Sequence, residues 1–144
     1  MHPYPHVYKV SAVAASEGDV VLASPGLADV PSMAPPEFGG PPGYWSPETL
    51  LAAAVADCFV LSFRAVARAA KFEWKDVSAE VDAVLDRVDG VAHFTRFTTR
   101  ARLVIPAGGD AARGRTLMEK AEKVCLVSNS LKGERHLESE VVEG

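Results

Sequence analysis

The sequence predicts one domain of mixed strand and helix content, with its elements in the order strands, loop, helix, strands, helix. Three patterns support this order: a long apolar helix signal near the middle of the chain, a pair of strongly alternating segments after it, and a shorter capped helix near the C-terminus. The chain has 144 residues, of which 48% are hydrophobic and 24% are charged, so it can form a core without a metal or disulfide. Its net charge of −4 argues against a general nucleic-acid-binding protein, which would carry a basic excess.

The N-terminal third contains a predicted hairpin and a long loop. Residues 7–14 and 20–23 are rich in β-branched residues and flank a short turn sequence, which is typical of two paired strands. Residues 25–45 are predicted to be irregular, because six prolines and four glycines between positions 25 and 44 exclude a regular element. A structureless stretch of this length is either functional or a proline-stiffened surface loop. Three aromatic residues in it are expected to anchor the loop or to line a substrate pocket: Phe38, Tyr44 and Trp45.

A long helix is predicted over residues 46–70. Ser46 can cap its free amide groups, Pro47 suits the first helical position, and Glu48 complements the positive helix end. Residues 50–63 are apolar on nearly every side, so every side of this helix must be covered. One small sheet covers only one side, and the small alanine side chains allow another helix to approach closely. We therefore expect an obligate homodimer.

Two alternating segments, residues 77–88 and 93–105, are predicted to form an antiparallel pair of strands. In both segments the odd-numbered residues are mostly apolar and face inward. Opposed residues of antiparallel strands share a face, and a two-residue turn at the Asp-Gly dipeptide between the segments would oppose odd to even positions. We therefore expect either a three-residue loop or a bulge. The same register pairs Glu80 with Arg100 on the solvent-facing side.

The C-terminal part is predicted to contain a second helix and a closing strand. Asp110 caps a helix over residues 110–125, and residues 138–142 have the composition of a strand. Cys125 stands at the end of this helix, near the start of a short helix or turn over residues 126–131. Three residues are expected to form the buried stripe of the second helix: Leu117, Ala121 and Val124.

The two cysteines, Cys58 and Cys125, allow four interpretations. They can be small buried hydrophobic residues, which is a common use of cysteine. A zinc site is disfavoured and no metal is expected, because the four histidines are scattered and no Cys-x-x-Cys or His-Glu-x-x-His spacing occurs. A hydrolase triad lacks its Gly-x-Ser-x-Gly turn. The remaining interpretation is a redox pair that is distant in sequence but close in space.

The sequence predicts a cytoplasmic protein. Residues 1–6 lack the basic start and apolar core of a signal peptide, and the apolar run over residues 50–63 is too short to span a bilayer. No membrane partner is therefore expected. Thiols in the cytoplasm are kept reduced, so a permanent structural disulfide is not expected either.

Two segments around the cysteines resemble the motifs of a known family. Residues 46–59 look like the central-helix signature of the OsmC/Ohr family of thiol peroxidases, with a Pro-Glu helix start, ten residues from Glu48 to Cys58, and then an aromatic residue. Residues 120–129, which include Cys125, resemble the second cysteine motif of that family. The resemblance extends over residues 38–142.

This resemblance implies an α+β, OsmC-like fold, in which a curved antiparallel sheet packs against a long buried central helix in an intertwined homodimer. It implies reduction of organic hydroperoxides to alcohols without a cofactor, with Cys58 as the peroxidatic thiol, Cys125 as the resolving thiol and Glu48 as a further catalytic residue. An external dithiol, such as a lipoyl-type group, would reset the pair. The alternative is a non-catalytic member of the fold that binds an apolar or thiol-reactive ligand.

One residue of the family pattern is missing. Relatives carry an arginine in the loop before the central helix, held by the helix-start glutamate. Here Glu48 matches that glutamate, but the first arginine is Arg64 and the one earlier lysine is Lys9. Another group must therefore activate Cys58. Ten residues of helix also separate Glu48 from its own Cys58 by about 15 Å, so any role of Glu48 near a cysteine is expected across the dimer.

Overall fold

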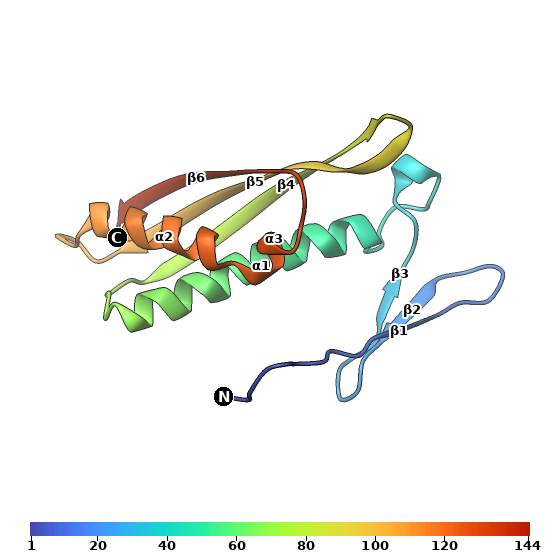
Figure 1. Cartoon of the computed structure of the whole chain (residues 1–144), viewed down its shortest axis with the longest axis horizontal. Helices are drawn as coiled ribbons and strands as arrows, with labels where there is room; N and C mark the ends of the chain where they lie inside the picture. Colours follow the sequence, from blue (N-terminus) through green and yellow to red (C-terminus); the bar gives the residue numbers. More distant parts are fainter. The chain divides into compact units, whose positions relative to one another are not determined.

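The computed structural model describes all residues from 1 to 144 (Figure 1). The chain divides into two compact units, Met1–Leu50 and Leu51–Gly144. The first unit contains a small sheet and the segment rich in proline and glycine. The second contains most of the long helix, a second sheet and both cysteines, and it therefore holds the residues with the clearest chemistry.

The sheet of the first unit is a three-stranded antiparallel meander. It is formed by β1 (Ser11–Val13), β2 (Val20–Ala23) and β3 (Val30–Ser32) in that spatial order, so the predicted hairpin is confirmed with a shorter first strand. Strand β3 and a 3-10 helix, η1 (Pro36–Phe38), lie inside residues 25–45, so the prediction that this segment is wholly irregular is wrong. The proline in β3 is tolerated because an edge strand leaves one row of amide positions unpaired.

The long helix α1 (Pro47–Ala69) begins and ends within one residue of the prediction. Its cap is reciprocal: the Thr49 amide donates to Ser46 Oγ at 3.1 Å, and the Ser46 amide donates to Thr49 Oγ1 at 2.9 Å. By length and composition alone α1 could cross a membrane, with a mean hydropathy of 1.9, so the argument from its short apolar run is too weak. Core helices of soluble proteins pass the same test, and Phe59 and Phe63 are fully buried in the core.

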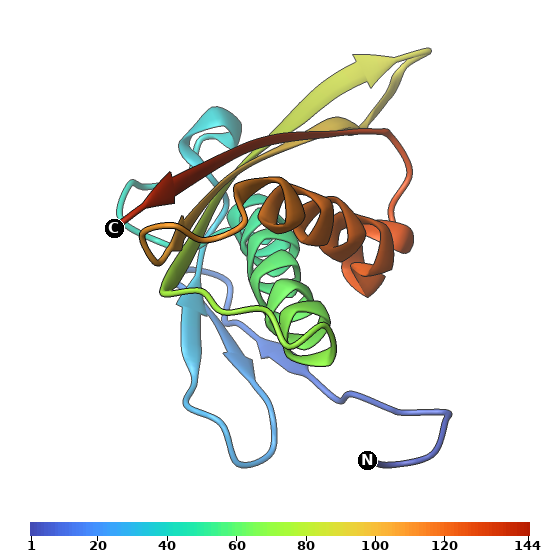
Figure 2. The ribbon, with the colours of Figure 1, turned by 90° about the vertical axis from the view of Figure 1, so that its left-hand side faces the viewer.

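The second sheet consists of β4 (Asp76–Val88), β5 (Val91–Ile105) and β6 (Glu134–Glu143), in the order β4-β5-β6. Strands β4 and β5 are antiparallel, whereas β6 lies parallel to β5. A parallel neighbour requires a crossover, which the chain makes through α2 (Ala111–Val124) and α3 (Leu126–Asn129). Helices α1 and α2 lie side by side on one face of this sheet (Figure 2). The α+β class is confirmed, and the sheet is mixed rather than antiparallel throughout.

A bulge in the β4–β5 pair keeps the odd-numbered, inward residues of both strands on the same face of the sheet. Val88 pairs with Val91, so the loop is the two-residue turn Asp89-Gly90. Both turn residues have positive φ angles, 52° and 78°, as in the turn type that suits a right-twisted hairpin. The register then shifts beside Val84, which returns the inward residues of both strands to one face. The predicted bulge is confirmed, and the three-residue loop is wrong.

The outer face of this sheet carries charges that neutralise one another. Glu80 pairs with Arg100 as predicted, with a nitrogen–oxygen distance of 3.5 Å. Asp82 approaches the same guanidinium more closely, at 2.6 Å, and its hydrogen bond to Arg100 lowers the pKa of Asp82. This arginine is therefore an exposed cross-strand partner rather than part of an anion site.

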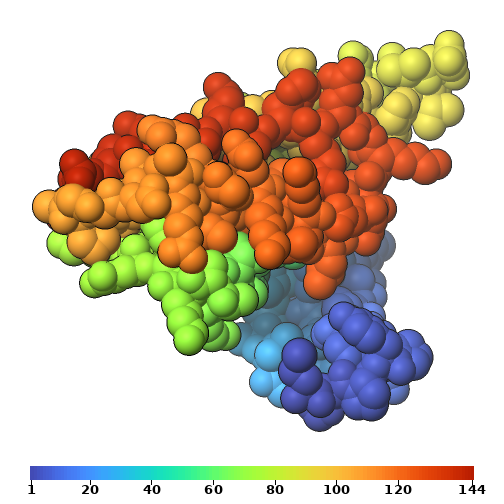
Figure 3. Space-filling model, turned by 60° about the vertical axis from the view of Figure 1, so that its left-hand side comes forward, coloured from blue at the N-terminus to red at the C-terminus, as the bar shows by residue number.

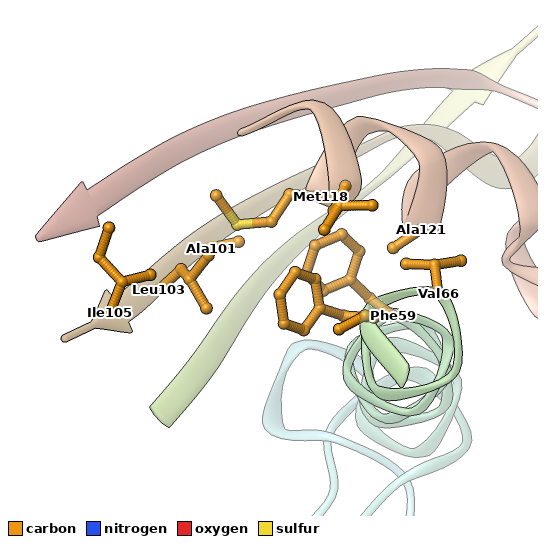
Figure 4. Packing of buried hydrophobic residues seen from close by; sticks show 10 residues of the cluster. Phe59, Val66, Ala101, Leu103, Ile105, Met118 and Ala121 are labelled. Carbon is orange, nitrogen blue, oxygen red and sulfur yellow. The ribbon is translucent and has the colours of Figure 1, made fainter. Parts of the chain in front are cut away.

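The core of the second unit lies between the sheet and helices α1 and α2 (Figure 4). Phe59 of α1, Leu103 of β5 and Met118 of α2 have no exposed area, and burying a side chain of this size contributes about 1.5–3 kcal/mol. Gly114 allows α2 to approach β5, since a Cβ there would lie 3.0 Å from a Leu103 methyl group. Val124 in the last turn of α2 is 49% exposed, so the predicted buried stripe is wrong at that position, and Met118 belongs to it instead.

Candidate functional site

Cys58 lies near the middle of α1, and its half-buried side chain lines a surface pocket of about 450 Å³ between α1 and α3. Ser62, one turn further along α1, places its hydroxyl oxygen 3.9 Å from Cys58 Sγ, and Asp57 is the other polar lining residue. The rest of the wall is apolar and consists of Ala54, Leu61, Ala65, Leu126 and Val127. An apolar molecule that enters this pocket therefore meets a thiol.

Cys125 lies at the junction of α2 and α3, where it ends one helix and precedes the next. Helix α2 and the segment after it form a continuous surface in Figure 3, and Cys125 itself has no exposed area. Its thiol donates a hydrogen bond to Ser128 Oγ at 3.4 Å. Burial raises the pKa of Cys125, and the neighbouring Cys58 thiol raises it further, while hydrogen bonds with the Ser128 side chain and backbone lower it.

The structure brings the two cysteines together. The neighbouring Cys58 thiol raises the pKa of Cys125. Leu126 and Val127, which directly follow Cys125, line the pocket of Cys58. Both cysteines are free thiols. The two thiols therefore differ in access: Cys58 faces a pocket, and Cys125 stands beside it without contact with solvent.

A polar network holds the backbone on both sides of Cys125. Arg135 of β6 donates from Nε to Glu122 Oε1 at 2.9 Å, from Nη1 to Asn129 Oδ1 at 2.7 Å, and from Nη2 to the Glu122 carbonyl. The Cys125 amide donates to that same carbonyl at 3.4 Å, and the Asn129 amide donates to the Cys125 carbonyl at 2.9 Å. The Asn129 side chain also donates to the Lys123 carbonyl at 3.1 Å. One arginine thus ties together the two residues that bracket the buried thiol.

Glu48 and the three aromatic residues belong to the first unit. One carboxylate oxygen of Glu48 is buried and has no hydrogen-bond partner, and the residue forms no ion pair. Glu48 and Phe38 line an apolar cavity of about 460 Å³ within this unit, whereas Tyr44 and Trp45 are about half exposed and lie outside its lining. In relatives of the resembled family, this glutamate holds an arginine. In this chain no positively charged side chain lies within ion-pair distance of Glu48.

Two residues of the site were not singled out from the sequence. Ser128 follows Cys125 by three residues, and this spacing returns to the same side of a helical turn, so a Cys-x-x-Ser pattern could have indicated it. Arg135 offered no comparable signal, because the predicted closing strand began three residues after it. No group of three or more histidine, cysteine or acidic side chains could hold a metal ion.

The chain is similar to known proteins over most of its length. Residues 40–140 match the family described as OsmC-like protein. The organic hydroperoxide resistance protein of Xanthomonas axonopodis pv. citri (strain 306) is 32% identical over 125 residues, which cover 85% of this chain and 84% of that protein. Peroxiredoxin OsmC of Escherichia coli (strain K12) is 32% identical over 89 residues, or 62% of each chain. The crystal structure of an organic hydroperoxide resistance protein from Legionella pneumophila, 26% identical, matches with a TM-score of 0.76 over 99% of this chain and 100% of that chain.

Proposed function

The chain belongs to the family of OsmC-like proteins, and we propose that it is a thiol-dependent peroxidase that reduces organic hydroperoxides to alcohols. One observation carries this proposal: a half-buried thiol, Cys58, faces an apolar pocket while a second, fully buried thiol, Cys125, stands next to it. Two cysteines that only fill the core would not be expected to face a pocket or to lie next to each other. The names of the similar proteins from Xanthomonas and Escherichia coli point to the same chemistry.

In the first step, the thiolate of Cys58 attacks the terminal oxygen of the hydroperoxide. A sulfur–oxygen bond forms, the oxygen–oxygen bond breaks, and the alkoxide takes up a proton and leaves as the alcohol. Cys58 is thereby oxidised to a sulfenic acid, and the peroxide is reduced by two electrons. The apolar wall of the pocket favours a peroxide with an organic group over hydrogen peroxide.

In the second step, Cys125 attacks the sulfur of the Cys58 sulfenic acid. A disulfide forms, the sulfur–oxygen bond breaks, and water leaves, which prevents further oxidation of Cys58. An external dithiol then reduces the disulfide by exchange and becomes a disulfide itself. Two observations support this two-cysteine cycle: Cys58 raises the pKa of Cys125, and Cys58 lines one pocket with the two residues that follow Cys125.

We further propose that two copies of the chain associate. Only 28% of the most apolar window of α1 is buried within one chain. A second copy would cover this apolar surface and would remove it from water. Size-exclusion chromatography with light scattering measures the expected dimer mass, and a monomer mass at micromolar concentrations contradicts the proposal.

The peroxidase activity is tested by steady-state turnover of cumene hydroperoxide with a dithiol reductant. We expect turnover by the unchanged protein and none by Cys58→Ser, which retains the fold but lacks the nucleophile. Turnover by the unchanged protein that does not exceed that of Cys58→Ser would falsify the proposal. That result would favour the second candidate, a non-catalytic binding protein, which the unpartnered Glu48 carboxylate supports because the arginine that it would hold in a peroxidase is missing.

A further inference from the structure

Ser128 is the side chain that forms a hydrogen bond with the buried thiol of Cys125. Its hydroxyl oxygen lies 3.4 Å from Cys125 Sγ, and only 4% of the residue is exposed. The residue belongs to α3, the four-residue helix that starts directly after Cys125, and its backbone also acts on the sulfur. A buried hydroxyl needs a partner, and here the partner is the sulfur itself.

The second step of the proposed cycle needs Cys125 as a thiolate, and burial disfavours that charged form. The sulfur that attacks a sulfenic acid reacts as a thiolate, and charge is disfavoured where solvent is excluded. Burial raises the pKa of Cys125, as does the neighbouring Cys58, whereas the hydrogen bonds with the Ser128 side chain and backbone lower it. Ser128 thus contributes the interactions that favour the reactive form of this thiol.

We propose that Ser128 is a catalytic residue of the resolving step, in which its hydroxyl accepts the Cys125 thiol proton at rest and donates to the sulfur as negative charge develops on it. This role rests on the proposed peroxidase function. The atoms balance within the pair: the sulfur–sulfur bond forms, the sulfur–oxygen bond of the Cys58 sulfenic acid breaks, and the thiol proton leaves with that oxygen as water. Ser128 is unchanged at the end, since its hydroxyl only rotates from acceptor to donor.

The other charged groups around Cys125 do not supply this interaction. On α1, Cys58 is the titratable group that shifts the pKa of Cys125, and this shift is upward. Asp57 lines the pocket on the Cys58 side. Glu122 of α2 and Arg135 of β6 pair with each other at 2.9 Å. The contribution of Ser128 is therefore not duplicated by a cation.

The test separates the two chemical steps. Reduced protein is mixed with one equivalent of cumene hydroperoxide, and mass spectrometry follows trapped Cys58 sulfenic acid and the disulfide at several pH values. The variants are Ser128→Ala, Ser128→Thr, which keeps the hydroxyl, and Ser130→Ala as the matched control. Ser130 belongs to the same segment and is exposed, and its hydroxyl donates to the Leu126 carbonyl at 2.8 Å without contact with sulfur.

We expect Ser128→Ala to form the sulfenic acid within about twofold of the normal rate and to form the disulfide about tenfold more slowly at neutral pH, since hydrogen bonds to charged groups contribute on this order. The defect should shrink as pH rises, because the thiolate of Cys125 then forms without help. Ser128→Thr should recover part of the rate, and Ser130→Ala should resemble the unchanged protein. When a second equivalent of cumene hydroperoxide is added, it should over-oxidise Cys58 to the sulfinic acid in Ser128→Ala but not in the unchanged protein.

A failure of the proposed function and a failure of the role of Ser128 give different results in this experiment. If the unchanged protein forms neither the sulfenic acid nor the disulfide, the proposed function itself is overturned. Normal sulfenic acid formation with an unchanged disulfide rate in Ser128→Ala overturns the role of Ser128. A defect of equal size at every pH, without recovery in Ser128→Thr, also overturns it, because it indicates a displaced Cys125 rather than a lost hydrogen bond.

Discussion

The two cysteines show how one chemical group acquires two environments in one small chain. Cys58 stands in the middle of a long helix, where its backbone groups are already paired, and its side chain reaches a pocket of about 450 Å³. Cys125 stands where two helices meet, is fully buried, and is bracketed by residues that Arg135 holds. The difference is one of access: only Cys58 can meet a substrate, and Cys125 can meet only Cys58 and protein.

The serine hydroxyls beside the two thiols differ in their distance from the sulfur. Ser62 lies 3.9 Å from the sulfur of Cys58, a long and weak contact, whereas Ser128 lies 3.4 Å from the sulfur of Cys125 and is itself buried. Hydrogen bonds are stronger where water is excluded. We infer that the reactivity of the accessible thiol depends on its pocket, whereas the reactivity of the buried thiol depends on its protein neighbours.

The largest effect is expected from replacing each thiol by a hydroxyl. Cys58→Ser should lose at least about a thousandfold in peroxide reduction, because a serine hydroxyl is a far weaker nucleophile. Cys125→Ser should still consume the first equivalent of peroxide at a near-normal rate and then fail to turn over. Single-turnover kinetics measures both. The contrast breaks down if Cys125→Ser also loses the first turnover.

The next effect concerns reactivity toward a small alkylating reagent. In the native protein at neutral pH, Cys125 should react on the order of a hundredfold more slowly than Cys58, because burial blocks access and its raised pKa lowers the thiolate fraction. Raising the pH should increase the alkylation rate of Cys125, since the fraction of thiolate grows as pH approaches the raised pKa. Mass spectrometry of time-resolved labelling measures both rates, and equal rates in the folded protein would contradict the burial of Cys125.

A smaller effect is expected from Arg135→Met, which removes the guanidinium but keeps most of the stem. The Arg135 side chain is 28% exposed and that of its partner Glu122 is 16% exposed, so the loss should lower the free energy of unfolding by about 1–3 kcal/mol. Alkylation of Cys125 should accelerate, because its segment loses support on both sides. Chemical denaturation and labelling measure the two results.

The matched control for Arg135→Met is Arg96→Met. Arg96 is 52% exposed and reaches Glu134 at 3.7 Å on the solvent side of the sheet, where ion pairs contribute little. Its change in unfolding free energy should stay within about 0.5 kcal/mol, and the alkylation of Cys125 should not change. Equal destabilisation by both variants would show that the position of Arg135 is not special.

The smallest effect is expected from Ser62→Ala. Because the hydroxyl of Ser62 lies 3.9 Å from Cys58, its loss should change the rate of the first oxidation step by no more than about twofold. The measurement is the pseudo-first-order rate of sulfenic acid formation with excess peroxide. A tenfold loss would mean that the accessible thiol also depends on a hydroxyl, and the contrast with Ser128 would then disappear.

Much of the fold was predictable because local patterns repeat over a few residues. The Ser46 cap and the apolar run placed α1 within one residue, and the alternation of β4 and β5 set the pairing of Glu80 with Arg100. The parity of that alternation even required the bulge, although not the two-residue turn beside it. Strand β3 was missed because its proline argues against a strand, and only its place at a sheet edge permits one.

The candidate site was predictable in part. The motifs around Cys58 and Cys125 singled out both thiols, since each motif is a continuous stretch of chain, whereas the peroxidatic and resolving roles stay a prediction. The support of Cys125 could not be predicted, because Arg135 comes from β6, and nothing local in its sequence says that it meets Glu122 and Asn129. The parallel placement of β6 beside β5 makes that meeting possible.

Local patterns in the sequence were therefore enough to predict the long helix, the pairing of Glu80 with Arg100 and the two thiols, because caps, alternation and motifs are properties of neighbouring residues. Only the folded chain shows that Cys58 faces a pocket while Cys125 is buried, that Ser128 contacts the buried thiol, and that Arg135 holds the segments beside it. These contacts depend on the packing of α1, α2 and β6 against one another, and packing is set by the shape and volume of side chains far apart in the chain.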